Sequence, residues 1–304
     1  MRRIIYAFCG LVALTILFAV IGSELMFSQT AHNSPAAEAH YRRGLSLYHK
    51  LDCEGAIKEF NKAIAINPTA KYYTARGECK ARSAFGNNDV TNTVERLRSV
   101  AFADLEKASE LDPKYAKAYF ARAMIYQRSY LTFTNTKEMN DVALAYFAKA
   151  IELDPKNADF YHGRAEFYSR VLSDHAKAGS DFDMAVRLSP DKKDYRYDRA
   201  ENLAYLDNLK GAILDMSYVL AKYPKDFAAR NTRADFYYKD GQYQNALADL
   251  NALLRLDPNS GITVLPERAK VYRAIGDEKR AVADEKRFSN LLNSLEKTKK
   301  TLTK

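Results

Sequence analysis

The feature that most restricts the fold of this 304-residue chain is a proline that recurs behind an apolar segment. The intervals from Pro190 to Pro224 and from Pro224 to Pro258 are both 34 residues, and the interval from Pro155 to Pro190 is 35. Because proline disfavours helix at the residue before it, each proline marks the end of a helix. The full series is Pro68, Pro113, Pro155, Pro190, Pro224 and Pro258. A repeat of this length predicts a stack of similar helical units.

Small and large apolar residues recur at fixed places inside this unit. Ahead of Pro224 stand Ala200, Ala212, Met216 and Val219. The same spacings start from three further small residues, which are Gly44, Ala234 and Ala269. Small residues allow two helices to approach closely, and the larger residue fills the space beside them. The pattern indicates a pair of antiparallel helices, which cannot cover its apolar face alone but can do so in a stack.

These spacings resemble those of the tetratricopeptide repeat family, whose signature is a small residue in the first helix, then alanine, an aromatic residue, alanine and proline. The resemblance covers about residues 36–293. It implies an all-α fold, a right-handed superhelical solenoid of about seven antiparallel helix pairs over residues 37–293. The expected repeats are residues 37–69, 70–114, 115–156, 157–191, 192–225, 226–260 and 261–293.

Three repeats are longer than the others. Extra residues separate the two helices of the second and third repeats, at 82–98 and 128–140, and the fourth repeat, from Ala165 to Pro190, carries one extra residue. The two longer insertions fall at the same turn of successive repeats, so we expect them to project from one edge as loops or helix extensions. Loops on a rigid scaffold often carry function, but such turns also tolerate insertions at little energetic cost. Both interpretations stay open.

An arginine stands immediately before the small residue of every expected first helix. An acid recurs in the second helix of six repeats, and Tyr146 takes its place in the third, which contains Arg122. Free arginines would form a ladder for phosphate or carboxylate groups. Because the acid recurs with the arginine, we instead expect pairs that lock helix to helix. The expected pairs are Arg43 with Glu59, Arg76 with Asp104, Arg164 with Asp181, Arg199 with Asp215, Arg233 with Asp249 and Arg268 with Asp284.

In tetratricopeptide arrays the first helices line a concave groove that holds an extended or helical peptide, so the resemblance implies a partner-binding face. Helical spacing places the residues three before, one after and four after the small residue on that face. Its front is apolar and aromatic and comprises Tyr41, Leu45, Tyr48, Phe120, Met124 and Gln127. Its rear is polar and acidic and comprises His162, Glu166, Tyr197, Glu201, Asn231, Asp235 and Tyr238. We expect a peptide with apolar anchors at one end and a basic residue at the other; the alternative is a solvated surface.

Residues 1–24 contain an uncharged apolar run from Ile4 to Ile21 behind two arginines. Such a run spans about 27 Å as a helix, close to the thickness of a hydrocarbon core. The small-residue pattern of a cleavage site is missing, which predicts an uncleaved signal anchor, with a cleaved signal peptide as the alternative. The arginines should stay cytoplasmic, which places the solenoid on the extracytoplasmic side, the periplasm in a bacterium. Residues 25–36 would form a linker and residues 294–304 a basic tail.

The formal charge of +9 favours anionic partners, but arginines paired with acids are not free to bind phosphates, so we expect no nucleic acid partner. Three cysteines are too few for a disulfide framework and lack the spacing of a zinc site. Cys53 and Cys79 either form one bridge between neighbouring repeats or remain free thiols. No Gly-rich phosphate loop, H-E-x-x-H or G-x-S-x-G motif occurs. The sequence therefore predicts no enzyme, metal site, cofactor or small-molecule substrate.

Together these features predict a membrane-anchored scaffold for protein–protein interaction that binds a protein or peptide segment in its concave groove. Three alternatives stay open. Signal cleavage would leave a soluble exported binding protein, and the opposite topology would give a receptor on an organelle membrane that faces the cytosol. The third alternative is a nucleic-acid binder.

Overall fold

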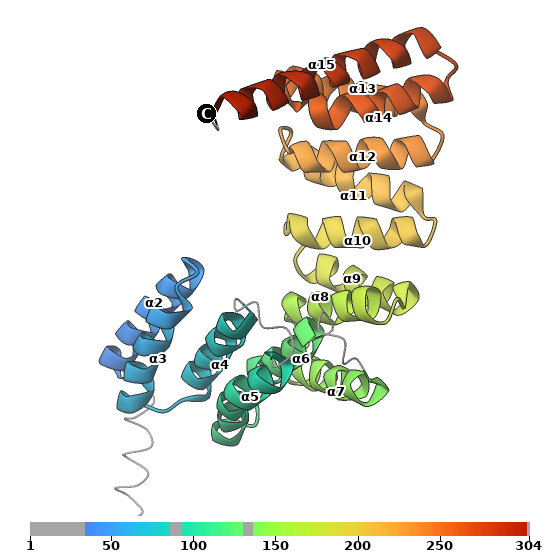
Figure 1. Ribbon diagram of the computed structural model, residues 1–304. Coiled ribbons are helices and arrows are strands. Elements are labelled where there is room, and N and C mark those ends of the chain that lie inside the picture. The colour runs from blue at the N-terminus through green and yellow to red at the C-terminus, as the bar shows by residue number, and fades with distance from the viewer. Residues whose placement is uncertain (1–33, 86–92, 130–135, 303–304) are drawn as a thin grey trace, which may run out of the picture. The chain divides into compact units, whose positions relative to one another are not determined.

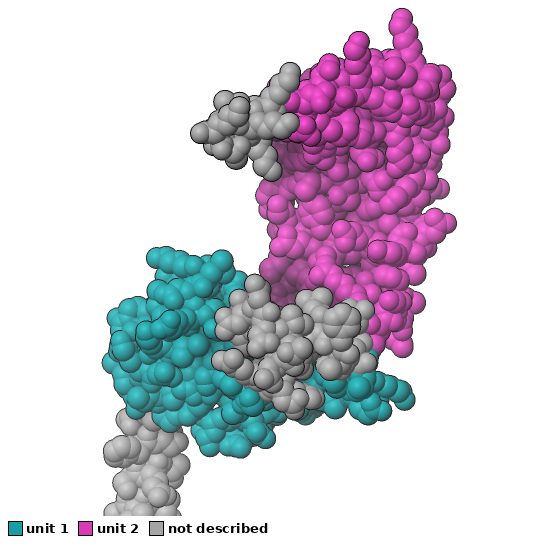
Figure 2. Space-filling model, viewed as in Figure 1, with its two compact units in different colours: residues 1–155 teal, residues 156–304 magenta. Residues whose placement is uncertain are grey.

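The structure, a computed structural model, describes residues 34–85, 93–129 and 136–302 and builds them almost entirely from α-helices (Figure 1). No strand occurs in these ranges. The helices fall into two compact units, residues 1–155 and residues 156–304, which Figure 2 shows in different colours. The fold of the described part of the chain is therefore all-α, as the repeat pattern predicts.

Within each unit every α-helix packs against the next one along the chain. Unit 1 comprises α2 (Pro35–His49), α3 (Cys53–Ile66), α4 (Ala70–Phe85), α5 (Thr93–Leu111), α6 (Ala116–Ser129) and α7 (Lys137–Leu153). Unit 2 comprises α8 (Ala158–Glu166), the π-helix η2 (Phe167–Val171), α9 (His175–Leu188), α10 (Lys193–Tyr205), α11 (Leu209–Lys222), α12 (Phe227–Lys239), α13 (Tyr243–Leu256), the 3-10 helix η3 (Pro258–Ser260), α14 (Gly261–Ala274) and α15 (Glu278–Leu302). Each even-numbered α-helix is the first helix of a repeat, and the odd-numbered helix after it is the second.

The second helices end where the prolines predict. Helix α3 ends at Ile66, two residues before Pro68, and α13 ends at Leu256, two residues before Pro258. The same offset separates α5, α7, α9 and α11 from their prolines. The prediction of these helix ends is confirmed, and its physical basis is the clash between the proline ring and a helical residue before it.

The small residue of a first helix faces the large residue of its second helix. A Cβ atom on Gly44 would lie 2.5 Å from Cε1 of Phe60, closer than carbon atoms pack. Phe60 is fully buried, so the ring has no open space to move into. In the fifth repeat Ala200 and Met216 belong to one buried cluster in the same way. Close approach of the two helices therefore explains the recurring glycine or alanine.

All six expected arginine–acid pairs are present, and each joins an arginine to the carboxylate of its own repeat. Arg199 donates through Nε and Nη2 to both oxygens of Asp215, at 2.7 and 2.6 Å. Bidentate pairs also join Arg76 to Asp104, Arg164 to Asp181, Arg233 to Asp249 and Arg268 to Asp284. Arg43 donates through Nε to Glu59 at 3.0 Å. The aspartates of the five bidentate pairs are buried, so these guanidinium groups join a first helix to its second helix largely away from bulk water, whereas the side chain of Arg43 is 57% exposed.

The remaining Nη1 group of several arginines reaches the second helix of the preceding repeat. Arg199 Nη1 donates to Asp183 at 3.0 Å, and Arg233 Nη1 donates to Ser217 at 3.0 Å. Arg76 and Arg268 make the same contact with Asn61 and Asn251. One arginine therefore joins three helices and two repeats. The accepting residue always stands two positions after the acid of its own repeat, a regularity that the sequence analysis missed.

The single extra residue of the fourth repeat is accommodated by η2, which directly continues α8. A π-helix adds one residue to a helical turn, and such segments are frequent at functional sites. Arg170 lies in this segment and reaches Asp198 on α10, with Nη2 and Oδ1 3.0 Å apart. The extra residue thus changes which polar side chains meet between α8 and α10.

The described parts of the two insertions extend helices. Residues 82–85 belong to α4 and residues 93–98 to α5, and the residues between them lie outside the described part. In the second insertion, residues 128–129 belong to α6 and residues 137–140 to α7. A role of either insertion in binding stays a prediction.

The expected transmembrane anchor, residues 1–24, also lies outside the described residues, and so does most of the linker 25–36. In the ranges that the structure describes, no helix has both the length and the apolar character needed to span a membrane. At the other end, α15 continues to Leu302 and includes most of the expected basic tail, residues 294–304.

Candidate functional site

The first helices of the last three repeats line an open hollow of about 670 Å³, which we call the main hollow. Its wall comes from α10, α12 and α14, with buried residues of the core behind them. Four residues of the expected partner-binding face come together in it, namely Glu201, Asn231, Asp235 and Tyr238. The wall also contains residues that the sequence analysis did not select, including Tyr205, Thr263, Lys239, Glu267 and Lys270.

A second hollow of about 390 Å³, the side hollow, lies between η2, α9 and α10. Arg170, His175 and Asp198 line it, and it shares Glu201 and Tyr205 with the main hollow. The ring of Tyr205 is 73% exposed and lies nearly parallel to the ring of His175, with 4.4 Å between the centroids. An exposed aromatic ring therefore stands where the two hollows meet.

The acidic residues of these hollows differ in whether a cation already neutralises them. Asp235 pairs with Lys239 at 2.7 Å, and Glu267 lies 3.7 Å from Lys270. Glu201 is exposed, and within the described residues it makes no ion pair and no side-chain hydrogen bond. Its carboxylate is therefore the acid in the main hollow that is open to a cationic ligand.

An amide without a partner lies on the same wall. Oδ1 of Asn231 is shielded from solvent and has no hydrogen-bond partner among the described residues. A shielded polar atom that lacks a partner costs about 1–3 kcal/mol. A ligand could recover that free energy by donating a hydrogen bond to this oxygen once the Asn231 side chain turns it toward the hollow.

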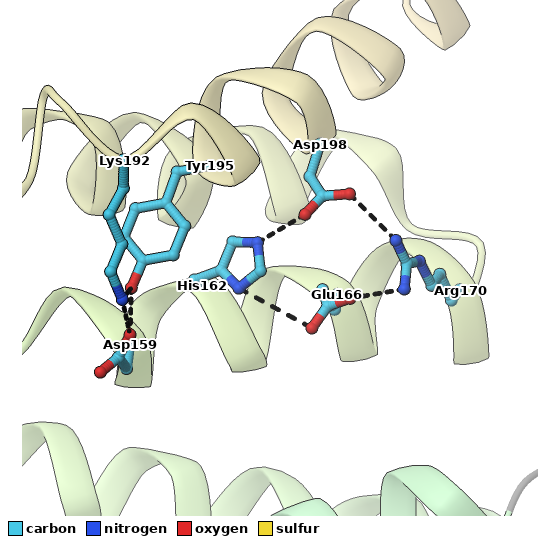
Figure 3. Close-up of polar contacts among 7 residues, drawn as sticks. All are labelled: Asp159, His162, Glu166, Arg170, Lys192, Tyr195 and Asp198. Carbon is cyan, nitrogen blue, oxygen red and sulfur yellow. Dashed lines mark hydrogen bonds and ion pairs between the residues drawn. The ribbon is translucent and has the colours of Figure 1, made fainter. Parts of the chain in front are cut away.

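A network of charged side chains joins α8 and η2 to α10 beside the side hollow (Figure 3). His162 lies between two carboxylates, with Nε2 2.6 Å from Asp198 Oδ2 and Nδ1 3.7 Å from Glu166 Oε2. Arg170 bridges the same two carboxylates, at 2.5 Å to Glu166 and 3.0 Å to Asp198. The His162 ring also stacks on Tyr195 with 4.4 Å between centroids.

Glu166 is therefore not an open acid, and its part in binding a partner stays a prediction. Its carboxylate is 16% exposed and already pairs with Arg170 and His162. Arg170 lies one helical turn after Glu166, as Lys239 does after Asp235, and it also reaches Asp198 on α10. In the expected acidic line, Glu201 keeps an unpaired carboxylate and Asp235 is paired with Lys239.

Two tyrosines near the start of α10, Tyr195 buried and Tyr197 half-buried, donate to aspartates in or directly before neighbouring first helices. Tyr195 donates to Asp159, which Lys192 also binds at 2.8 Å. Tyr197 donates to Asp226 at 2.9 Å and packs in the core cluster of the fifth repeat. Tyr197, expected on the partner-binding face, therefore has its hydroxyl engaged with Asp226 rather than open to a ligand.

We expect these tyrosines to make the fold sensitive to alkali. Burial and the hydrogen bond to Asp159 raise the pKa of Tyr195 to about 12, and burial with the bond to Asp226 raises the pKa of Tyr197. The unfolded chain loses these protons near pH 10, so between about pH 10 and about pH 12 the folded state binds more protons. The urea midpoint followed by circular dichroism should therefore fall between pH 9 and pH 11, by about 10–30% of its value. In a Tyr195→Phe, Tyr197→Phe variant the urea midpoint should fall less over this pH range. An equal fall would contradict the assignment of the alkali sensitivity to these two tyrosines.

In unit 1 the expected apolar front is largely used for packing. Tyr41 lies against the rings of Phe60 and Tyr72, with centroids 5.8 and 5.0 Å apart. Leu45 and Tyr48 are half-buried against the same cluster, which is built around Phe60. These side chains hold the first two repeats together, and apolar anchoring of a peptide by them stays a prediction.

The three expected residues of α6 are half-buried as well. Phe120 meets the edge of Phe147 at 6.0 Å between centroids. Met124 is only partly accessible, and the shielded Oε1 of Gln127 has no hydrogen-bond partner among the described residues. The same helix carries Arg122, which lacks an acid.

Arg122 meets an aromatic ring in place of a carboxylate. Its guanidinium lies 5.4 Å from the ring centroid of Tyr146, the residue that replaces the acid in the third repeat. Tyr146 in turn stacks on Tyr126 at 6.2 Å. The shielded Nε of Arg122 has no hydrogen-bond partner among the described residues. A cation–π contact thus takes the place of the ion pair in this repeat.

The sequence could have identified some residues of the main hollow that the chosen offsets did not select. Lys270 follows the small residue Ala269 directly, as Glu166, Glu201 and Asp235 follow theirs. Lys239 lies one helical turn after Asp235, on the same face. Extending the offsets to the seventh repeat and by one turn would have found both lysines. Arg170 stands at the same spacing after Glu166, so the extension by one turn would have found it as well.

The described residues show no arrangement for metal chemistry, since no group of histidine, cysteine, aspartate and glutamate side chains in them can hold a metal ion. The candidate binding features of unit 2 are an open carboxylate, an unpartnered amide oxygen and an exposed ring along a shallow hollow. Such groups bind by hydrogen bonds, charge and apolar contact.

Comparison with known proteins gives the same architecture. A family model described as a tetratricopeptide repeat matches residues 146–201, and a second with the same description matches residues 24–71 and 197–261. Serine/threonine-protein phosphatase 5 of Rattus norvegicus is 29% identical over 109 residues, which are 34% of this chain and 20% of the phosphatase. The same values hold for the phosphatase of Mus musculus. The chain thus spans a fifth of the length of these curated relatives.

Solved structures of similar fold include YrrB, described as a TPR protein with an unusual peptide-binding site, with TM-score 0.51 and 21% identity over 62% of this chain and 91% of that chain. A thermophilic TPR protein from Thermus thermophilus has TM-score 0.53 and 20% identity over 67% of this chain and 100% of that chain. PilW, a type IV pilus biogenesis factor, has TM-score 0.51 and 22% identity over 70% of this chain and 92% of that chain. At these identities the likeness shows the fold alone. Since the family models together match more than half of the residues, the chain belongs to the tetratricopeptide repeat family.

Proposed function

We propose that this chain is a protein-binding scaffold and that unit 2 binds an extended peptide segment of a partner along the main hollow. Tetratricopeptide repeats present extended surfaces that suit protein–protein interaction. The observation that carries the proposal is the wall of the main hollow, where the open carboxylate of Glu201 and the unpartnered amide oxygen of Asn231 occur together.

An extended peptide offers the groups that these residues lack. Its backbone N–H groups are donors for Oδ1 of Asn231, and an arginine or lysine side chain supplies the cation for Glu201. The exposed ring of Tyr205 gives the aliphatic part of that side chain, or a neighbouring apolar residue, a surface to pack on. We therefore assign the partner segment a basic residue and at least one apolar residue beside it.

Charge reversal at Glu201 tests this assignment. A library of extended peptides is screened against the chain by fluorescence anisotropy, and the strongest binder is measured against variants. Glu201→Lys should weaken binding of a peptide with arginine or lysine by roughly tenfold, about 1.4 kcal/mol, since attraction becomes repulsion. The effect should shrink at high salt, which screens the charges.

The matched control is Asp183→Lys. Asp183 lies on the second helix α9 and its side chain is 58% exposed, so the variant changes the net charge equally without altering the main hollow. It should leave the affinity within about twofold. If Glu201→Lys and Asp183→Lys weakened peptide binding equally, the effect would be one of general charge. If no peptide of the library bound, the alternative of a solvated surface would hold.

We also propose that residues 1–24 anchor the scaffold in a membrane, with the repeats on the extracytoplasmic side. The apolar run and the two arginines before it support this topology. The mass of the mature amino terminus tests the anchor, because loss of this segment would show a soluble exported protein instead. Protease protection tests on which side of the membrane the repeats lie. Digestion of the repeats from the cytosolic face would show the opposite orientation.

A further inference from the structure

Two thiols meet at the junction between the first and the second repeat. Cys53 is the first residue of α3 and is half-buried, whereas Cys79 lies in α4 and is fully buried. Cys53, Ala56 and Phe60 are spaced so that they share one face of α3. Cys79 packs in one cluster with Ala56 and Phe60, and thus on that same face.

The two thiols also influence each other electrostatically. After burial, the neighbouring Cys53 is the largest cause that raises the pKa of the Cys79 thiol. Helices α3 and α4 pack against each other, so the pair lies inside unit 1 and joins consecutive repeats. We propose that Cys53 and Cys79 form a reversible disulfide that clamps the first repeat onto the second.

The chemistry requires an oxidant, for which a small disulfide such as oxidised glutathione or a dithiol–disulfide oxidoreductase is the class that fits. The accessible Cys53 thiolate attacks one sulfur of the carrier, its bond to that sulfur forms and the carrier S–S bond breaks. The first carrier thiol leaves with the proton that Cys53 has lost. The sulfur of Cys79 then attacks Cys53, which releases the second carrier thiol with the proton from Cys79. Two electrons and two protons pass from the chain to the carrier.

The order of attack follows from exposure. Burial raises the pKa of the Cys79 thiol, so this residue is slow to react with an oxidant in solution. Cys53 is the one that a carrier can reach, and Cys79 is placed to resolve the mixed disulfide. The pair therefore works as an accessible thiol with a resolving thiol beside it.

The clamp acts between two neighbouring repeats. Each repeat of a solenoid contacts its neighbours only, so one repeat can open separately from the others. The disulfide would join α3 of the first repeat covalently to α4 of the second. In the oxidised chain α2 and α3 then cannot open away from α4. Reduction of the disulfide restores this opening.

The experiment treats the reduced full-length chain with oxidised glutathione and maps its disulfides by digestion under non-reducing conditions. We expect a Cys53–Cys79 linked peptide, with Cys9 recovered separately. In Cys79→Ala, glutathione should remain on Cys53 as a mixed disulfide, because the resolving thiol is gone. In Cys53→Ala, Cys79 should stay a free thiol until the chain is denatured.

Hydrogen exchange of the wild-type chain gives a readout that does not depend on the variants. Amides of α2 and α3 should exchange at least about tenfold more slowly in the oxidised chain, while those of α12 and α13 should not change. The proposal is overturned if glutathione persists on Cys53 of the wild type, if both thiols stay reduced, or if Cys9 takes part in the bridge. Exchange of α2 and α3 at equal rates in the two states would likewise rule out a clamp.

Discussion

Replacing Asp215 with alanine is expected to lower the free energy of unfolding by about 3–5 kcal/mol. The side chain is 2% exposed and accepts hydrogen bonds from two arginines, with Arg196 Nη1 at 2.8 Å and Arg199 Nε at 2.7 Å. Removing the carboxylate takes the ion-pair partner from Arg196 and leaves Arg199 only the exposed Asp183. Urea unfolding followed by far-UV circular dichroism measures the change, and hydrogen exchange of α10 and α11 locates it.

Asp183→Ala is the matched control for this prediction. Asp183 pairs with the same Arg199 at 3.0 Å, but its side chain is 58% exposed. Solvent screens such a pair, so Asp183→Ala should lower the free energy of unfolding by less than about 1 kcal/mol. Equal losses in the two variants would contradict the assignment of the arginine row to buried pairing between helices.

Phe60→Ala is expected to destabilise the first repeat by about 3–5 kcal/mol. The ring is fully buried and fills the space that Gly44 leaves open between α2 and α3. Alanine in its place leaves a cavity that neither helix can close without moving. Because one repeat of a solenoid can open separately from the others, hydrogen exchange of α2 and α3 is the measurement to use.

The control for Phe60 lies on the same helix. Ile66 is 46% exposed at the end of α3, so Ile66→Ala removes a comparable apolar side chain without opening a cavity. Its effect on the exchange of α2 and α3 should stay below about 1 kcal/mol. An effect of Phe60→Ala no larger than this would contradict the packing of the small and large residues.

The helix ends and the contacts between helices could be predicted because they follow from local rules. A proline stops a helix wherever it stands, so Pro68 and Pro258 fix the ends of α3 and α13. The pairing of Arg199 with Asp215 follows from residues that recur together at one spacing. The prolines and the arginine–acid pairs both recur at a regular interval along the sequence.

The candidate site was less predictable because it depends on departures from the period. The extra residue of the fourth repeat is visible in the sequence, but its conversion into η2 depends on how α8 packs against α9 and α10. Arg170, one helical turn after Glu166, neutralises an acid that the first-helix offsets present as open, and it also pairs with Asp198 of α10. Offsets alone also cannot show that Tyr197 donates to Asp226, since that contact joins two repeats.

The expected apolar front shows the same limit in another form. Offsets place Tyr41 and Tyr48 on the exposed side of α2, yet long aromatic side chains reach sideways to neighbouring helices. Tyr41 packs on Tyr72 of α4, and Arg82 of α4 lies over Tyr48 at 4.9 Å. Residues with shorter or charged side chains, such as Glu201 and Asp235, stay on the face that the offsets predict.

The central claim is that the first-helix face of unit 2 binds a peptide. The most direct test attaches a photoreactive diazirine to the strongest peptide of the library and maps the crosslinks on the full-length chain by mass spectrometry. The claim predicts crosslinks on α10, α12 and α14, at residues such as Tyr205 and Tyr238, which disappear with excess unlabelled peptide. Crosslinks concentrated on the second helices α11 and α13, or in unit 1, would contradict it.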